Sequence, residues 1–98
     1  MNIIPLETIP NQSFSITLEG ITYQITLRTA QNATLASIES GGRTLITNAL
    51  CVPGGNILPY PAYKQSGNFR FMCQDNQYPY YENFGKTCFL IYVPEAEL

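Results

Sequence analysis

Hydrophobic and polar residues alternate strictly along two neighbouring segments near the start of the chain, residues 13–19 and residues 21–28. In the first segment, Phe14 and the apolar residues at every second position after it share one side, and serines and threonines share the other. Alternation with a period of two is typical of a strand with one buried face. Glu19 and Gly20 form the connection, so the pattern predicts a β-hairpin with a tight turn.

The central part of the chain predicts a second hairpin. The pattern of residues 33–39 indicates a shorter strand whose alternation slips near Ser37, as it does at a β-bulge. Gly41 and Gly42 suit the turn that follows. Residues 44–52, which are rich in apolar residues and threonine, are then expected to form the partner strand.

Two further strands are expected in the C-terminal third. Residues 69–73 alternate, whereas residues 88–93 (CFLIYV) are continuously apolar, as in a strand buried on both faces. Residues 56–67 and 75–86 combine tyrosine, proline and polar residues without a period, and we expect two long loops there. The prediction is an all-β fold, a small antiparallel barrel or sandwich of six or seven short strands with two long aromatic-rich loops.

The length of 98 residues suits one hydrophobic core, so we expect residues 1–98 to form a single domain that ends in a polar tail, residues 94–98. Residues 1–10 form an apolar arm interrupted by Pro5 and Pro10, neither of which can donate to a strand ladder. We hypothesise that this arm docks on a neighbouring subunit; the competing interpretation is that it adds an edge strand to its own sheet. The candidate interface residues of the arm are Ile3, Ile4, Leu6 and Ile9.

The composition is 45% hydrophobic and only 12% charged, against about 25% charged residues in an average soluble domain. This shortage of charge favours a subunit whose surface is largely covered by partners. The net charge of −2 and the scattered basic residues argue against a nucleic-acid ligand, because phosphate binding depends on clustered lysine and arginine. Apolar runs are too short for a membrane span, so no membrane partner is expected.

The residues that usually carry metal and redox chemistry are sparse. There is no histidine, and Cys51, Cys73 and Cys88 include no CxxC pair, so we expect no zinc site and no cofactor. We interpret the cysteines as three buried or partly buried free thiols in a reducing compartment, with one disulfide as the alternative.

Catalytic residues are not apparent either. Without histidine, a general base would have to be a carboxylate, a lysine or a thiolate, and none of these forms a recognisable constellation. Asp75 and Glu82 share a loop and could in principle pair as acid and base, but nothing else in the sequence favours such a pair. We therefore expect a protein that is not an enzyme.

Aromatic residues concentrate in the two long loops, where a small core does not require them. Tyrosine offers a large apolar face with a polar tip, which suits protein interfaces. The alternatives are that the loops fold back and cap the ends of the barrel, or that they stack nucleic-acid bases in a module of OB type, which the charge balance opposes. The candidate interface residues in the loops are Tyr60, Tyr63, Tyr78, Tyr80, Tyr81 and Phe84.

The opening MNIIPLETIPNQSFSITLEGITYQITL resembles the start of the baseplate plug family of contractile-tailed phages, the cyanophage-type plug. Further landmarks follow in order along nearly the whole chain: ALC at residues 49–51, GNFRF at 67–71, PYY at 79–81, and FG before the apolar last strand. The residues that would carry the N-terminal motif are Ile3, Pro5, Leu6, Ile9 and Pro10.

This resemblance implies a structural subunit of the virion, in the phage tail baseplate near the tail axis where the tube meets the hub and spike. Expected partners are other baseplate proteins, namely the tube initiator or tail tube, the hub and the spike, together with copies of the chain itself in a symmetric ring. Assembly would take place in the bacterial host cytoplasm. The alternatives are a small OB-like β-barrel binding module and a tail assembly factor.

Overall fold

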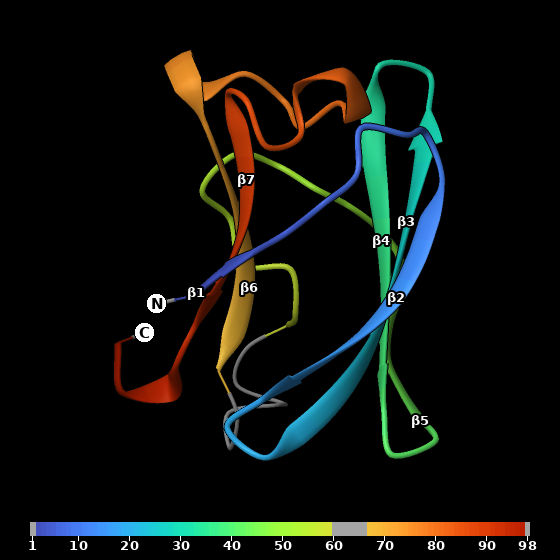
Figure 1. Cartoon of the computed structure of the whole chain (residues 1–98), viewed down its shortest axis with the longest axis vertical. Coiled ribbons are helices and arrows are strands. Elements are labelled where there is room, and N and C mark those ends of the chain that lie inside the picture. Colours follow the sequence, from blue (N-terminus) through green and yellow to red (C-terminus); the bar gives the residue numbers. More distant parts are fainter. Residues whose placement is uncertain (1, 60–66, 98) are drawn as a thin grey trace.

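The computed structural model describes residues 2–59 and 67–97, which fold into two antiparallel β-sheets that face one another (Figure 1). The first sheet has the order β1–β7–β6. Its strands are β1 (Asn2–Ile4), β7 (Cys88–Val93) and β6 (Asn68–Cys73). The central strand β7 thus pairs on one edge with the start of the chain and on the other with the preceding strand, β6.

The second sheet is a four-stranded meander in which each strand pairs with the next, in the order β2–β3–β4–β5. The strands are β2 (Gln12–Leu18), β3 (Ile21–Ala30), β4 (Ala33–Ser40) and β5 (Arg43–Leu50). The all-β prediction is confirmed, with seven strands in the described part of the chain. Because the two sheets do not join into a closed cylinder, the architecture is the sandwich rather than the barrel.

The first hairpin turns at Glu19 and Gly20, which have φ angles of 52° and 80°. Positive φ at both central residues defines the type I′ turn, whose twist matches that of the flanking strands. The side chain of Glu19 therefore occupies a conformation that glycine adopts more readily. Leu18 and Ile21 face each other as the pair that closes the turn.

The slip expected near Ser37 is confirmed, because the register between β4 and β5 shifts between Ala36 and Ile38. Asn48, at a φ of 49°, is part of the irregular stretch of β5. Its backbone N–H donates to Oγ of Ser37 over 2.9 Å. A side chain of β4 thus replaces the carbonyl partner that a regular ladder would supply.

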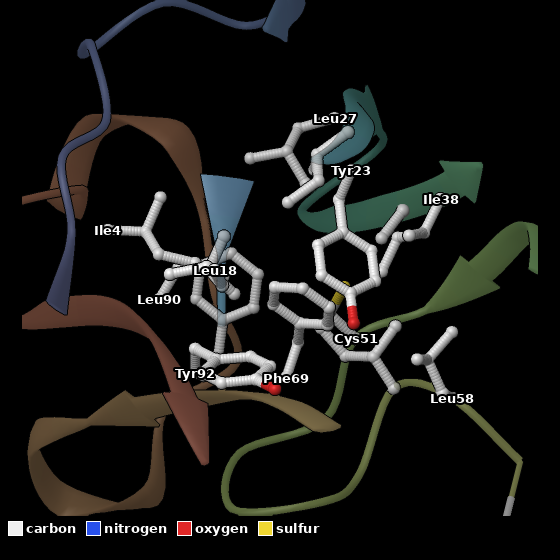
Figure 2. Close-up of a cluster of buried hydrophobic side chains, with 14 of the residues drawn as sticks. Ile4, Leu18, Tyr23, Leu27, Ile38, Cys51, Leu58, Phe69, Leu90 and Tyr92 are labelled. Carbon is white, nitrogen blue, oxygen red and sulfur yellow. The ribbon is translucent and has the colours of Figure 1, made fainter. Parts of the chain in front are cut away.

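The core lies between the two sheets and is built around three aromatic rings, with aliphatic side chains and Cys51 around them (Figure 2). Tyr23 of β3 meets Phe69 of β6 edge to face, with 5.1 Å between the ring centroids. Phe69 in turn lies 5.3 Å from the ring of Tyr92 in β7. Offset and edge-on aromatic contacts of this kind add to the stabilisation from burial, so this triad links the two sheets.

The N-terminal arm supplies β1, which pairs with β7 in the register Asn2 to Tyr92, Ile3 to Ile91 and Ile4 to Leu90. The first residues of the arm therefore add an edge strand to their own sheet, as the competing interpretation held. Ile4 is a core residue, covered by side chains of its own domain, because the strand alternation turns it inward.

The expectation of three free thiols is wrong, because Cys73 and Cys88 form a disulfide. These residues are directly opposed in the β6–β7 ladder, and their Cα atoms are 4.1 Å apart. The pairing follows from the strand register, which the spacing of cysteines in the sequence does not reveal. Cys51 remains free and is buried in the core.

Candidate interaction surfaces

The outward side of the β1–β7–β6 sheet is apolar, and we call it the outer apolar face. Ile3 is 65% exposed and Met72 is 48% exposed, and Phe89 between them is half-buried. A shallow hollow on this side is lined by Ile3, Met72, Phe89, Ile91 and Val93, together with Arg70 and Glu97. Exposed apolar side chains that gather on one side of a small domain commonly mark a protein–protein contact.

The strand pattern explains this face. In β6, Phe69 and Phe71 point into the core and Met72 points outward; β7 likewise has Leu90 inside and Phe89 outside. An apolar residue on both sides of a strand is typical of a strand covered on both faces. On the outer side, the described part of the chain buries Ile91 and Val93 but leaves Ile3 and Met72 exposed.

The second candidate surface is the connection between β6 and β7, residues 74–87. It contains two short 3₁₀ turns, Gln74–Asn76 and Tyr81–Asn83. The connection is anchored at its ends by the Gln74 N–H, which donates to the Thr87 carbonyl over 2.9 Å. Its middle is held by the buried Thr34 hydroxyl, which donates to the carbonyl of Pro79 over 2.9 Å.

Phe84 fixes the same connection to the core. Its ring stacks on that of Phe71 with 5.5 Å between centroids, and the side chain is buried. Phe84 was a candidate interface residue on sequence grounds, and the structure places it among core residues instead. This supports the interpretation that part of the loop caps the end of the sheet.

The tyrosines of the connection remain accessible. Tyr78 is 52% exposed, and the half-buried rings of Tyr80 and Tyr81 lie 4.7 Å apart. The neighbouring Tyr80 and Glu82 raise the pKa of the Tyr81 phenol, which favours its neutral form. We call Tyr78, Tyr80 and Tyr81 the tyrosine surface; it offers aromatic faces with uncharged polar tips.

The candidates named from the sequence thus separate into three groups. Ile3, Ile9 and Tyr78 are exposed, whereas Leu6, Tyr80 and Tyr81 are half-buried. Ile4 and Phe84 lie in the core. Tyr60 and Tyr63 fall outside the described residues.

Sequence reasoning missed Met72 and Phe89, which form the middle of the outer apolar face. A signal for Met72 was present, because it alternates with Phe71, which faces the core. Phe89 lies in the uninterrupted apolar run, where alternation cannot separate inward from outward positions. Only the placement of the strand in the sheet assigns its direction.

Asp75 and Glu82 are both exposed, as expected for solvated side chains. Within residues 2–59 and 67–97, no three His, Cys, Asp or Glu side chains come together as a metal site would require. No helix in this part of the chain is long and apolar enough to cross a membrane.

Residues 1–95 match the model of the family described as cyanophage baseplate Pam3 plug gp18. No curated protein matches the chain. The match includes the N-terminal arm, both sheets and the connection that carries the tyrosine surface.

The family is a structural component of a phage tail baseplate, which agrees with a domain that presents apolar and aromatic surface. Because the match spans nearly the entire sequence, the chain belongs to the cyanophage baseplate plug family and has a structural role in the phage baseplate.

Proposed function

We propose that this protein is a non-enzymatic subunit placed near the tail axis, where the tail tube meets the hub and spike. In this proposal the outer apolar face and the tyrosine surface are its contacts with neighbouring baseplate proteins. Copies of the chain surround the axis as a symmetric ring, and the particle assembles in the host cytoplasm.

The observation that carries the proposal is the outer apolar face. Ile3 and Met72 are large apolar side chains that are 65% and 48% exposed in the isolated domain. Burying apolar surface yields about 25 cal/mol per Å², so a neighbouring subunit that covers this face gains stability without any catalytic role. The low content of charged residues, 12%, points the same way.

The N-terminal arm fits the same arrangement. Ile4 anchors β1 in its own core, and Ile3 in the adjacent position projects into the outer apolar face. Ile9, farther along the arm, is also exposed. The arm can therefore complete its own sheet and contact a neighbour at the same time, through alternate residues.

Cross-linking of purified baseplates with a lysine-reactive reagent tests the proposal. Lys86 is exposed and lies within the connection that carries the tyrosine surface. We expect mass spectrometry to find Lys86 joined to tube, hub or spike proteins. Links confined to peripheral baseplate proteins would contradict the position near the axis.

A further inference from the structure

The two sheets have four edge strands, β1, β6, β5 and β2. Three of them, β1, β6 and β5, are protected against pairing with another strand. β1 has only three residues and is followed by Pro5. β6 is covered by the segment after β5, because the N–H groups of Gly54 and Ile57 donate to carbonyls of Phe71 and Phe69 over 2.8 and 2.9 Å. Short length, proline and covering segments are the usual protections of an edge.

The edge strand β5 is protected because its backbone is irregular. Its register against β4 shifts twice, and Asn48 adopts a positive φ of 49°. The strand also begins with a charged residue, Arg43. Bulges and charges both hinder the approach of another strand.

β2 carries none of these protections. Its seven residues, QSFSITL, include no charge and no proline, and they pair with β3 without a register shift. A regular, uncharged edge of this length is a ready site for another strand, since it presents a row of backbone donors and acceptors.

The direction of those backbone groups follows from the turn. In a two-residue type I′ hairpin the residues that flank the turn, Leu18 and Ile21, exchange both backbone hydrogen bonds, and bonded and non-bonded pairs then alternate along the ladder. Ser13, Ser15 and Thr17 are therefore in the non-bonded pairs, and their N–H and C=O groups point away from β3. In the described part of the chain, no recorded backbone hydrogen bond reaches these groups.

The inner side of β2 is also incompletely covered. Phe14 and Ile16 face the core yet remain half-buried, whereas Tyr23 and Ile25, opposite them in β3, are each 1% exposed. The inner face of the four-stranded sheet is thus more exposed to solvent at its edge strand β2 than at β3. An added strand would bury apolar surface as well as satisfy backbone groups.

We propose that β2 pairs antiparallel with β2 of a second copy, about a two-fold axis at Ser15. In this register Ser15 faces Ser15 of the partner subunit, and Ser13 faces Thr17 of the partner subunit. The outward N–H and C=O groups of Ser13, Ser15 and Thr17 in both copies then form hydrogen bonds across the axis. An axis at Phe14 or Ile16 would leave some of these groups without a partner within β2. The inner side chains match too, because Phe14 meets Ile16 of the partner subunit, and aromatic rings pair well with β-branched residues across strands.

Self-pairing is suited to this strand because it has no charges to oppose one another across the axis. A two-fold contact closes on itself and therefore yields a pair rather than a fibre. The inference goes beyond the proposed position in the baseplate and does not depend on it: the outer apolar face lies on the other sheet and stays open in the pair.

Analytical ultracentrifugation of the purified protein and two variants tests this pairing. We expect the wild type to sediment as a concentration-dependent dimer. Ser15→Pro removes one outward N–H and no bond of the β2–β3 ladder, so it should raise the dissociation constant by about tenfold or more while circular dichroism stays unchanged. Ser15→Lys places like charges across the axis and should have the same effect, which preserves the test if the proline variant does not fold.

Gln24→Lys is the matched control, because Gln24 lies opposite Ser15 on the same outer side but in the interior strand β3. The control should dimerise as the wild type does. A wild type that stays monomeric at every concentration, or a Ser15→Lys variant that dimerises normally, would overturn the proposal.

Discussion

Tyr92 in the last strand donates its phenolic hydrogen to Oε1 of Glu19, in the first hairpin turn, over 2.7 Å. The same hydroxyl accepts the backbone N–H of Gly67 over 2.9 Å. One oxygen thus joins the four-stranded sheet, the last strand and the residue that precedes β6. Burial, followed by the bond to Glu19, raises the pKa of this phenol above its ordinary range, so Tyr92 remains neutral throughout the physiological range.

Tyr92→Phe is expected to lower the free energy of unfolding by about 1–3 kcal/mol, because the buried N–H of Gly67 then lacks an acceptor. Thermal unfolding followed by circular dichroism should show a fall of about 4–8 °C for each kcal/mol lost in a domain of this size. An unchanged melting temperature would mean that the bonds contribute nothing to stability.

Tyr23→Phe should instead raise the free energy of unfolding. The Tyr23 hydroxyl is buried, and among the described residues it has no hydrogen-bond partner. Removing an unsatisfied buried hydroxyl recovers its desolvation cost while the ring keeps its contact with Phe69. We expect a gain of about 1 kcal/mol in the same denaturation experiment. A loss as large as that of Tyr92→Phe would show that the hydroxyl has a partner in solution.

These two tyrosines illustrate how much the sequence can predict. Alternation assigns Tyr23 correctly to the inside, whereas Tyr92 lies in the uninterrupted apolar run, which predicts burial but no direction. Alternation carries no information about the hydroxyl, however, because its partner lies on a segment far away in the chain. The pairing of Cys73 with Cys88 was missed for the same reason, since it depends on the register of two strands separated by a long connection.

The exposure of the candidate interface residues was predictable in part. Ile3 is exposed, as a contact with a partner requires, whereas its neighbour Ile4 faces the core. In the loops, composition indicated an aromatic surface. Only the fold separates Phe84, which stacks on Phe71 in the core, from Tyr78, which remains exposed. Composition specifies which side chains are present, and packing decides which of them reach solvent.

Thiol labelling tests the state of the cysteines. Burial raises the pKa of the Cys51 thiol from its ordinary value near 9 to about 12, so the native protein should not react at pH 8. Denaturant alone should expose one reactive thiol, and denaturant with reductant should expose all 3 cysteines. Three reactive thiols in denaturant without reductant would rule out the Cys73–Cys88 disulfide.

The raised pKa of the Cys51 thiol also makes the stability of the fold depend on pH. Because the folded state raises the pKa of Cys51, its contribution to stability is fully present below pH 9 and is lost as the pH rises toward 12. Cys51→Ala should weaken this alkaline loss of stability relative to the native protein.

Met72→Glu tests the outer apolar face. A carboxylate at this exposed position is tolerated by the free domain but must lose its hydration in an apolar contact. We expect normal folding and at least about a tenfold loss of incorporation into particles, measured by quantitative mass spectrometry. Thr47→Glu, on the exposed side of β5, is the control and should be incorporated normally. Equal incorporation of the two variants would exclude Met72 from any baseplate contact.

The position of the subunit is the central claim, and cryo-electron microscopy of intact contractile particles that carry this protein tests it most directly. The account predicts density for the two-sheet fold, repeated around the tail axis where the tube meets the hub, with the outer apolar face covered by a neighbour. A tail resolved throughout that contains no copy of this fold near the axis would contradict it.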